Sequence, residues 1–253
     1  GYRRAQAPYG QASFMVGQQR ILQEVTRLKE SASPDEAGLY DDLTTLLTSG
    51  RSHKMAPVVA SVLGRAPGRI LDIGCGYGAL AIYFALRGIE TVGIDLKDEA
   101  LKAGSRLAAE LGLSNVTLTA MDACSISVTD FDLALSTDFF EHLTYQQQPL
   151  HLRSVWQALK PGGIYMIRAP HRANIRQHMV EHIGLPSFRT LRQQAMDAGF
   201  SVRFGIAHTS LISPVTYHMA LEQWFESRNW SGLAIYKGLQ KFGLANILAY
   251  LES

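Results

Sequence analysis

Cysteine is scarce in this chain. Cys75 and Cys124 are the only two among 253 residues, and Cys75 falls inside a glycine-rich loop. This pattern excludes the disulfide framework of a small secreted domain and favours a reducing compartment. We therefore expect a cytoplasmic location.

An excess of charge of one sign is also missing. Lys and Arg total 24 and Asp and Glu total 22, which leaves a formal net charge of +2. A nucleic-acid-binding surface usually carries a basic excess, so nucleic acid is not an expected partner. No stretch reaches the roughly 18–20 uninterrupted apolar residues that span a bilayer, so we expect no transmembrane segment.

The sequence does contain a regular alternation of short apolar strands and amphipathic helices. Predicted strands cover residues 69–73, 90–94, 116–120, 131–136, 164–168 and 200–206, and predicted helices cover 79–86, 98–111, 146–159 and 187–198. Such alternation is typical of an α/β fold with a doubly wound, mostly parallel sheet.

Both ends of the chain lack this alternation. Residues 11–50 predict two or three helices with a break and a capped restart at 31–36, and residues 214–253 also read as helical. We expect three parts: a helical N-terminal lid segment at 1–51, a core at 52–206 and a helical C-terminal lid or interface segment at 207–253.

The C-terminal part contains an unusually apolar segment, residues 233–251. A helix with so wide an apolar surface must bury it against the core, a second subunit or a membrane surface. We expect lid packing or a homodimer contact ahead of peripheral membrane contact.

A glycine-rich loop, Asp72 to Gly78, follows the first strand of the core. Its glycines allow a ligand to approach the backbone, and the next helix directs its N-terminus at the same place. The spacing Gly74-x-Gly76-x-x-Ala79 also fits a dinucleotide-binding loop, so a nicotinamide or flavin cofactor is an alternative. Asp72 opposes a pyrophosphate and suits a ligand that carries positive charge.

Two more acids follow the next two strands. Asp95 closes the second strand, where a carboxylate can accept both hydroxyls of a ribose, and Asp122 follows the third strand beside Ala123. Either acid alone is ordinarily a turn or cap residue. Together with Asp72 they indicate a nucleoside cofactor with a cationic part.

Five ordered motifs resemble those of the class I S-adenosylmethionine (SAM) dependent methyltransferases. They are ILDIGCGYGALAIYFALRG at 70–88, GIDL at 93–96, MDA at 121–123, FFEHL at 139–143 and LKPGG at 159–163. The resemblance covers about residues 52–206 and implies a seven-stranded sheet with one antiparallel strand.

The same resemblance implies a role for each part of the cofactor site. The loop glycines would wrap the methionine part of SAM, Asp95 would hold the ribose and Asp122 the adenine. The expected cofactor contacts are Asp72, Gly74, Cys75, Gly76, Gly78, Asp95, Leu96, Asp122, Ala123 and Thr137.

The acceptor is expected beyond the fourth strand, where Asp138, Glu141 and His142 offer two carboxylates and an imidazole. A divalent metal ion could bind them, lower the pKa of an acceptor hydroxyl and fix its oxygen. The cluster resembles the E-x-x-E-H element of ubiquinone-pathway O-methyltransferases and of small-RNA 2′-O-methyltransferases. A further His completes the metal site in the latter group, and His182 is favoured here over His178.

Two metal-free interpretations stay open. His142 can act as a general base with Glu141 as the second catalytic candidate, or Glu141 can orient the following helix while His142 packs under the acceptor pocket. A basic group after the fifth strand indicates either an anionic acceptor or solvated surface charge. That group is Arg168, His171, Arg172 and Arg176.

The expected function is methylation of a small-molecule acceptor, at oxygen because of the quinone-type resemblance. An RNA 2′-O-methyltransferase is the alternative within enzymes. A SAM-binding protein without methyl transfer is the alternative from another class.

Overall fold

The computed structural model describes residues 11–48, 67–170, 180–208 and 216–223. In chain order the elements are α1 (Gln11–Glu30), η1 (Pro34–Glu36), α2 (Ala37–Thr48), β1 (Arg69–Ile73), α4 (Ala79–Ala85), β2 (Glu90–Asp95), α5 (Asp98–Glu110), β3 (Val116–Ala120), β4 (Phe131–Thr137), η2 (Phe140–His142), α6 (Gln147–Ala158), β5 (Leu159–Pro170), α7 (Phe188–Asp197), β6 (Phe200–His208) and β7 (Thr216–Gln223). Among these described residues, no helix is both long and apolar enough to cross a membrane.

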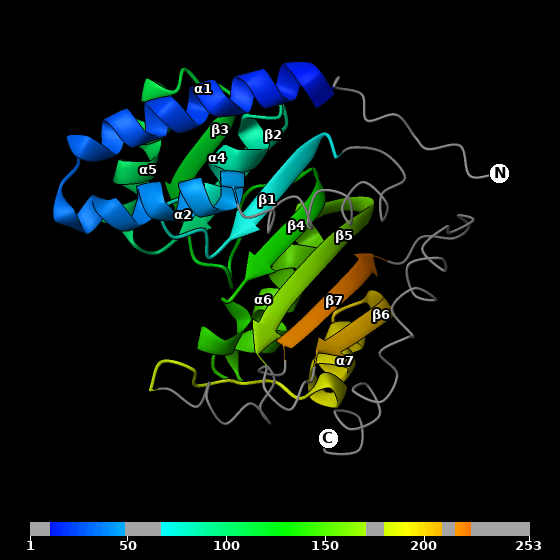
Figure 1. The fold of residues 1–253 in the computed structure, drawn as a ribbon. Coiled ribbons are helices and arrows are strands. Elements are labelled where there is room, and N and C mark those ends of the chain that lie inside the picture. The colour runs from blue at the N-terminus through cyan, green and yellow to red at the C-terminus, as the bar shows by residue number, and fades with distance from the viewer. Residues whose placement is uncertain (1–10, 49–66, 171–179, 209–215, 224–253) are drawn as a thin grey trace.

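The strands form one sheet in the order β3-β2-β1-β4-β5-β7-β6 (Figure 1). Strands β3, β2, β1, β4 and β5 are all parallel to their neighbours, whereas β7 runs antiparallel to both β5 and β6. The prediction of a doubly wound, mostly parallel α/β sheet is confirmed. The strand order reverses between β1 and β4, and ligands bind such sheets beyond the carboxyl ends of the strands at this reversal.

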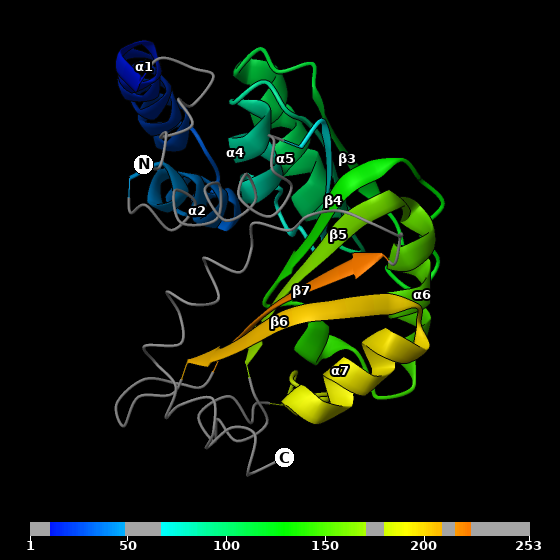
Figure 2. The same cartoon turned by 90° about the vertical axis from the view of Figure 1, so that its right-hand side faces the viewer.

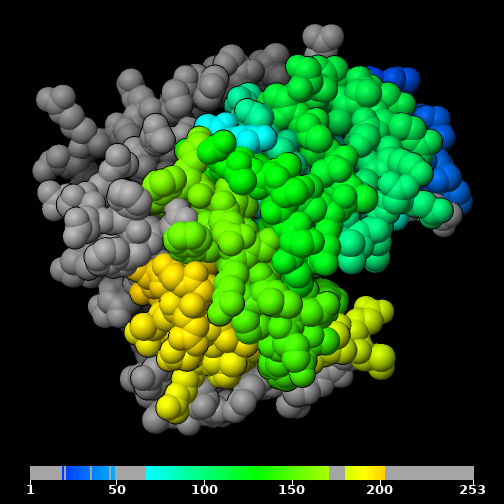
Figure 3. All heavy atoms as spheres, turned by 180° about the vertical axis from the view of Figure 1, so that it is seen from behind, coloured from blue at the N-terminus to red at the C-terminus, as the bar shows by residue number. Residues whose placement is uncertain are grey.

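Helices cover both faces of the sheet, with α4 and α5 on one face and α6 and α7 on the other (Figures 1 and 2). Successive strand residues point to opposite faces. In β1, Ile70 accordingly packs with the α4 side, whereas Leu71 and Ile73 pack with the α6 side. Viewed from behind, the surfaces of α6 and α7 are continuous, and the two helices are in contact (Figure 3).

The N-terminal helices α1 and α2 form a hairpin that packs against α4. Ser33 and Glu36 form a capping box at the restart of the helix, which confirms the predicted break. Buried side chains of the hairpin, such as Val25 and Leu43, share one hydrophobic cluster with Tyr83 of α4. The hairpin is therefore built into the core, and its role as a lid stays a prediction.

The helical prediction for residues 214–253 is wrong where the structure describes this segment. Residues 216–223 form β7, which pairs with β5 along one edge and with β6 along the other. The run Ala220 to Gln223 favours a helix locally, but two ladders of backbone hydrogen bonds override that weak preference. The apolar segment 233–251, with its expected lid, dimer or membrane contact, lies outside the described residues.

Candidate functional site

The glycine-rich loop follows β1 and is held by the end of β2. Gly74, Gly76 and Gly78 have φ of 67°, 55° and 77°. The N–H groups of Gly74 and Cys75 both donate to the Ile94 carbonyl, at 2.9 and 3.0 Å, and Gly76 N–H donates to Asp95 Oδ2 at 2.8 Å. These hydrogen bonds give the loop a defined shape.

Two of these glycines lie against side chains from neighbouring strands. A Cβ added at Gly74 would lie 2.2 Å from the Phe139 ring, and one added at Gly78 would lie 2.5 Å from the Leu118 side chain. Since both glycines also have positive φ, no other residue fits without strain. Phe139 thus brings the segment after β4 into direct contact with the cofactor loop.

Asp72 is a buried acid without a full set of partners. Its side chain is only 2% exposed, and Oδ2 has no hydrogen-bond partner. Burial raises the pKa of Asp72 to about 7; an N–H bond from Ala81 lowers it, and the charge of Asp95 raises it further. A positively charged ligand group beside Oδ2 would stabilise the carboxylate form.

Asp95 is the last residue of β2, and Asp122 lies two residues beyond the end of β3. The Asp95 carboxylate accepts N–H bonds from Gly76 and Lys97, at 2.8 and 3.0 Å, and each oxygen retains a further lone pair. Asp122 is exposed, and its Oδ1 accepts the Cys124 N–H at 2.8 Å. Both carboxylates therefore accept hydrogen bonds from nearby backbone N–H groups, as turn residues do. They can also accept further hydrogen bonds from a ligand.

The remaining predicted cofactor contacts line the same edge. Leu96 is 73% exposed directly after β2, so its apolar side chain is accessible to a flat ligand ring. Ala123 is buried, and Thr137 is half-buried at the end of β4. An open cavity of about 730 Å³ lies elsewhere, along α5 and β3, and no predicted site residue lines it.

Glu141 lies in the short helix η2, just beyond β4. It is 1% exposed, and its Oε2 has no hydrogen-bond partner. Burial raises the pKa of Glu141 to about 7; an N–H bond from its own backbone lowers the pKa, nearby Asp138 raises it and Arg168 lowers it. This carboxylate is the second buried acid with a free oxygen at this edge of the sheet.

The structure brings together three of the four predicted metal ligands. Ligand atoms of Glu141, His142 and His182 all lie within 4.8 Å of one another. Asp138 lies outside this group, so its role as a metal ligand stays a prediction that the geometry does not support. It is an exposed residue with φ of 55°, and its carboxylate pairs with the Arg168 guanidinium instead. His178 lies outside the described residues, as do His171, Arg172 and Arg176 of the predicted basic group.

The two histidines of this group are oriented by their surroundings. His142 Nδ1 lies 3.0 Å from the Glu181 carbonyl, so Nδ1–H donates and Nε2 keeps a free lone pair. The His142 and His182 rings meet edge to face, with centroids 4.9 Å apart. An imidazole held in this way can serve as a proton acceptor or as a metal ligand.

Comparisons with known proteins agree on one family. Residues 70–163 match a family described as "Methyltransferase domain". A ubiquinone biosynthesis O-methyltransferase of Azoarcus sp. is 31% identical over 168 residues, which cover 62% of this chain and 71% of that protein. The chain belongs to the class I SAM-dependent methyltransferases. Family membership favours SAM over the dinucleotide that the loop alone also allowed.

Other relatives match this chain over less of their own length. A 2-heptyl-1-hydroxyquinolin-4(1H)-one methyltransferase of Mycobacteroides abscessus is 32% identical over 41% of this chain and 47% of that protein. The chain spans half or less of the first relatives that it matches. A solved SAM-dependent methyltransferase of Methanosarcina mazei shares the fold, with a TM-score of 0.55 at 20% identity over 67% of this chain and 98% of that one.

Sequence reasoning missed two buried polar residues of α6, Gln148 and His151. Both are 0% exposed. Gln148 Nε2 donates to the carbonyls of Leu143 and Gly184, at 3.3 and 2.6 Å, and so joins the loop after Glu141 to the loop after His182. The available signal was their helical spacing with Leu152, Val155 and Ala158, which places polar side chains on the buried face of the helix.

Proposed function

We propose that this methyltransferase transfers the methyl group of SAM to a hydroxyl oxygen of a small-molecule acceptor. The observation that carries the proposal is the group of Glu141, His142 and His182 beyond β4. Phe139 connects that segment to the cofactor loop at Gly74. The similarity to a ubiquinone biosynthesis O-methyltransferase supports oxygen as the methylated atom.

In this proposal the cofactor site is built from residues that fit SAM. The unpartnered oxygen of Asp72 would face the cationic methionine part, and Asp95 has lone pairs left for the ribose hydroxyls. When bound, SAM supplies an electrophilic methyl group on a sulfonium. The continuation of the sheet through β7 and β6 is consistent with the seven strands that the family resemblance implies.

His142 is the proposed general base. With Nδ1–H directed to the Glu181 carbonyl, Nε2 is free to take the proton of the acceptor hydroxyl as the oxygen attacks the methyl carbon. Glu141 is placed to stabilise the imidazolium that results, because ligand atoms of the two side chains lie within 4.8 Å of each other. Transfer then leaves a methyl ether, a proton on His142 and S-adenosylhomocysteine.

A divalent metal ion is the second form of the same proposal. Glu141, His142 and His182 would hold it, and a carboxylate with two imidazoles suits Zn²⁺, Fe²⁺ or Mn²⁺. Ligand atoms on one such ion, at about 2.1 Å from it, lie at most about 4.2 Å apart. Ligand atoms that lie within 4.8 Å need only a small side-chain movement to meet this limit. The ion would acidify and position the acceptor hydroxyl.

Incubation with methyl-labelled SAM and three probes tests the reaction class: a catechol such as 3,4-dihydroxybenzoate, an aromatic amine and a short RNA. We expect label on the catechol oxygen, identified by mass spectrometry. Label only on the amine would contradict O-methylation, and label on a ribose 2′-oxygen would replace the small-molecule acceptor with RNA. Exhaustive chelation, metal analysis and re-addition of a divalent metal ion separate the general-base form of the proposal from the metal form. Full activity without metal would leave His142 as the base.

A further inference from the structure

A line of buried hydrogen bonds crosses the core between β4 and the turn after β3. Ser136 Oγ lies 2.7 Å from the Tyr165 hydroxyl, which lies 2.6 Å from His151 Nε2. His151 Nδ1 lies 3.0 Å from the carbonyl oxygen of Ala123. The side chains of Ser136, Tyr165 and His151 are all fully buried.

The direction of every hydrogen bond in this line is determined. A carbonyl oxygen only accepts, so His151 Nδ1–H is the donor to Ala123. Burial lowers the pKa of His151 to about 4, which keeps the ring neutral and leaves a lone pair on Nε2. Tyr165 O–H therefore donates to Nε2, and Ser136 O–H donates to the Tyr165 oxygen.

This arrangement holds groups in place and does not move protons. The line ends on a carbonyl oxygen, which has no proton to pass on and no further partner in the chain of bonds. The Phe139 and Phe140 rings both meet the His151 ring edge to face, at 5.6 and 5.8 Å between centroids. Packing and hydrogen bonding thus allow the imidazole a single orientation.

The position of His151 is one where an apolar residue would be expected. It lies on the buried face of α6 next to Leu152, and a buried polar group costs free energy unless each of its hydrogen bonds is made. What the imidazole adds over a leucine is a fixed location for the Ala123 carbonyl. Ala123 follows Asp122, in the turn where the adenine of SAM is expected.

We propose that His151 is a positioning residue for the cofactor: Tyr165 and Ser136 hold its ring, and Nδ1–H fixes the Asp122–Ala123 turn against which the adenine binds. This inference rests on the proposed SAM site. It assigns no contact between His151 and SAM. It predicts that binding of the adenosine half of the cofactor depends on His151, whereas the rate of methyl transfer does not.

The test compares His151→Leu with His151→Asn, whose amide can still donate to Ala123. Calorimetry with S-adenosylhomocysteine and with adenosine should show at least about tenfold weaker binding of both ligands to the Leu variant. The Asn variant should recover most of that loss. In steady-state assays of the Leu variant, KM for SAM should rise by the same factor, with kcat within about twofold of wild type.

Tyr165→Phe provides a second variant if the Leu variant does not fold. It leaves Nε2 without a donor, so ¹⁵N NMR of labelled histidine should show the single Nδ1–H tautomer in wild type and a changed Nε2 signal in the variant, with a few-fold rise in KM for SAM. Unchanged affinity in a folded Leu or Phe variant, or equal losses for Leu and Asn, would overturn the positioning role and leave the proposed function intact. A wild-type protein that binds no SAM would overturn both.

Discussion

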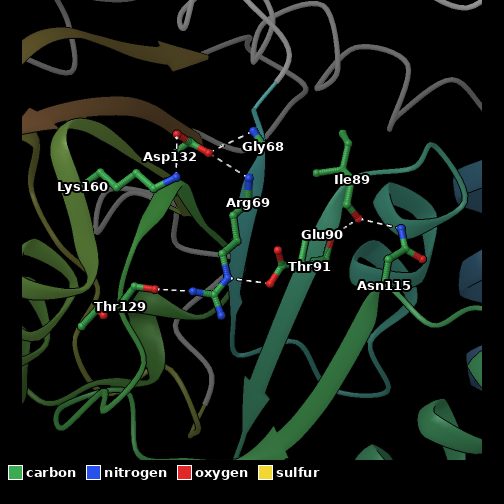
Figure 4. A network of polar contacts seen from close by, with 9 residues as sticks. All are labelled: Gly68, Arg69, Ile89, Glu90, Thr91, Asn115, Thr129, Asp132 and Lys160. Atoms are coloured by element: carbon green, nitrogen blue, oxygen red, sulfur yellow. Dashed lines mark hydrogen bonds and ion pairs between the residues drawn. The ribbon is translucent and has the colours of Figure 1, made fainter.

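Asp132 and Asp72 are buried aspartates on the neighbouring parallel strands β4 and β1, but they lie at opposite edges of the sheet. Asp132, near the amino end of β4, accepts N–H bonds from Gly68 and Arg69, both at 2.9 Å, and pairs with Lys160 at 3.2 Å (Figure 4). Asp72, near the carboxyl end of β1, keeps one oxygen without a partner.

The difference between these two acids separates folding from binding. Both side chains are nearly inaccessible, with residue exposures of 7% and 2%. Asp132 is satisfied by the chain itself and joins the start of β1 to β4 and β5. Asp72 is left for a partner that the chain does not supply, as Glu141 is at the same edge. Buried polar groups without partners are costly, so they persist where a ligand supplies the missing charge.

The largest effect is expected from Asp72→Asn. The substitution keeps the shape and removes the negative charge, so SAM affinity should fall by about 100-fold or more, in line with the loss of a buried charge pair. Thermal unfolding of the ligand-free protein should be unchanged or should shift upward, because a destabilising buried charge is gone. Calorimetry with SAM and a melting curve measure the two effects. A variant that binds SAM as wild type does would remove Asp72 from the site.

Asp132→Asn is the matched substitution at the other edge. It places an amide beside two N–H donors and a lysine, and we expect the free energy of unfolding to fall by about 2–3 kcal/mol. SAM affinity of the folded variant should stay within about twofold of wild type. Urea unfolding and calorimetry check both values. If the two variants showed the same pattern, the contrast between the edges would be wrong.

A pH series gives the sign of the Asp72 contribution. Its pKa rises from 3.8 in the unfolded chain to about 7 in the folded protein, so the folded state binds the extra proton between these values. Stability of the ligand-free protein should therefore fall as pH rises from about 4 to 7, by up to about 1.4 kcal/mol per pH unit from this group.

His151 contributes with the opposite sign, since its lowered pKa means that stability is lost as pH falls from 6.5 to about 4. The difference between wild type and Asp72→Asn isolates the Asp72 contribution from that of His151. Urea unfolding of both proteins at pH 5, 6, 7 and 8 measures this difference in the free energy of unfolding. Parallel pH profiles for the two proteins would mean that Asp72 does not titrate in this range.

The smallest effect is expected from Lys160→Met. The lysine side chain is 41% exposed, so its ion pair with Asp132 is screened by solvent and contributes about 0.5 kcal/mol or less. The two backbone N–H bonds to Asp132 remain in this variant. Urea unfolding of Lys160→Met and Asp132→Asn under the same conditions compares their free energies of unfolding. A loss as large as that of Asp132→Asn would assign the stability to the ion pair rather than to the N–H bonds.

Much of the fold, and the position of three aspartates at one edge of the sheet, was predictable from local pattern. Strand β3 was predicted with its observed bounds, and α4, β2 and α5 to within one residue at their ends. The chain order of Asp72, Asp95 and Asp122 was informative because the carboxyl ends of parallel strands meet at one edge. Periodicity and chain order suffice for such features, since they depend on residues close together in sequence.

Tertiary structure decided what depends on contacts between distant residues. β7 is a strand because β5 and β6 offer hydrogen bonds on both of its edges, against its local helix preference. The Asp138 carboxylate pairs with Arg168, 30 residues away, a partner that spacing along the chain did not indicate. His151 gained its tautomer from the Ala123 carbonyl, which can only accept a hydrogen bond, and Tyr165 holds the other ring nitrogen. Spacing along a chain predicts which residues lie near one edge, but the partners that packing supplies determine where each proton and charge resides.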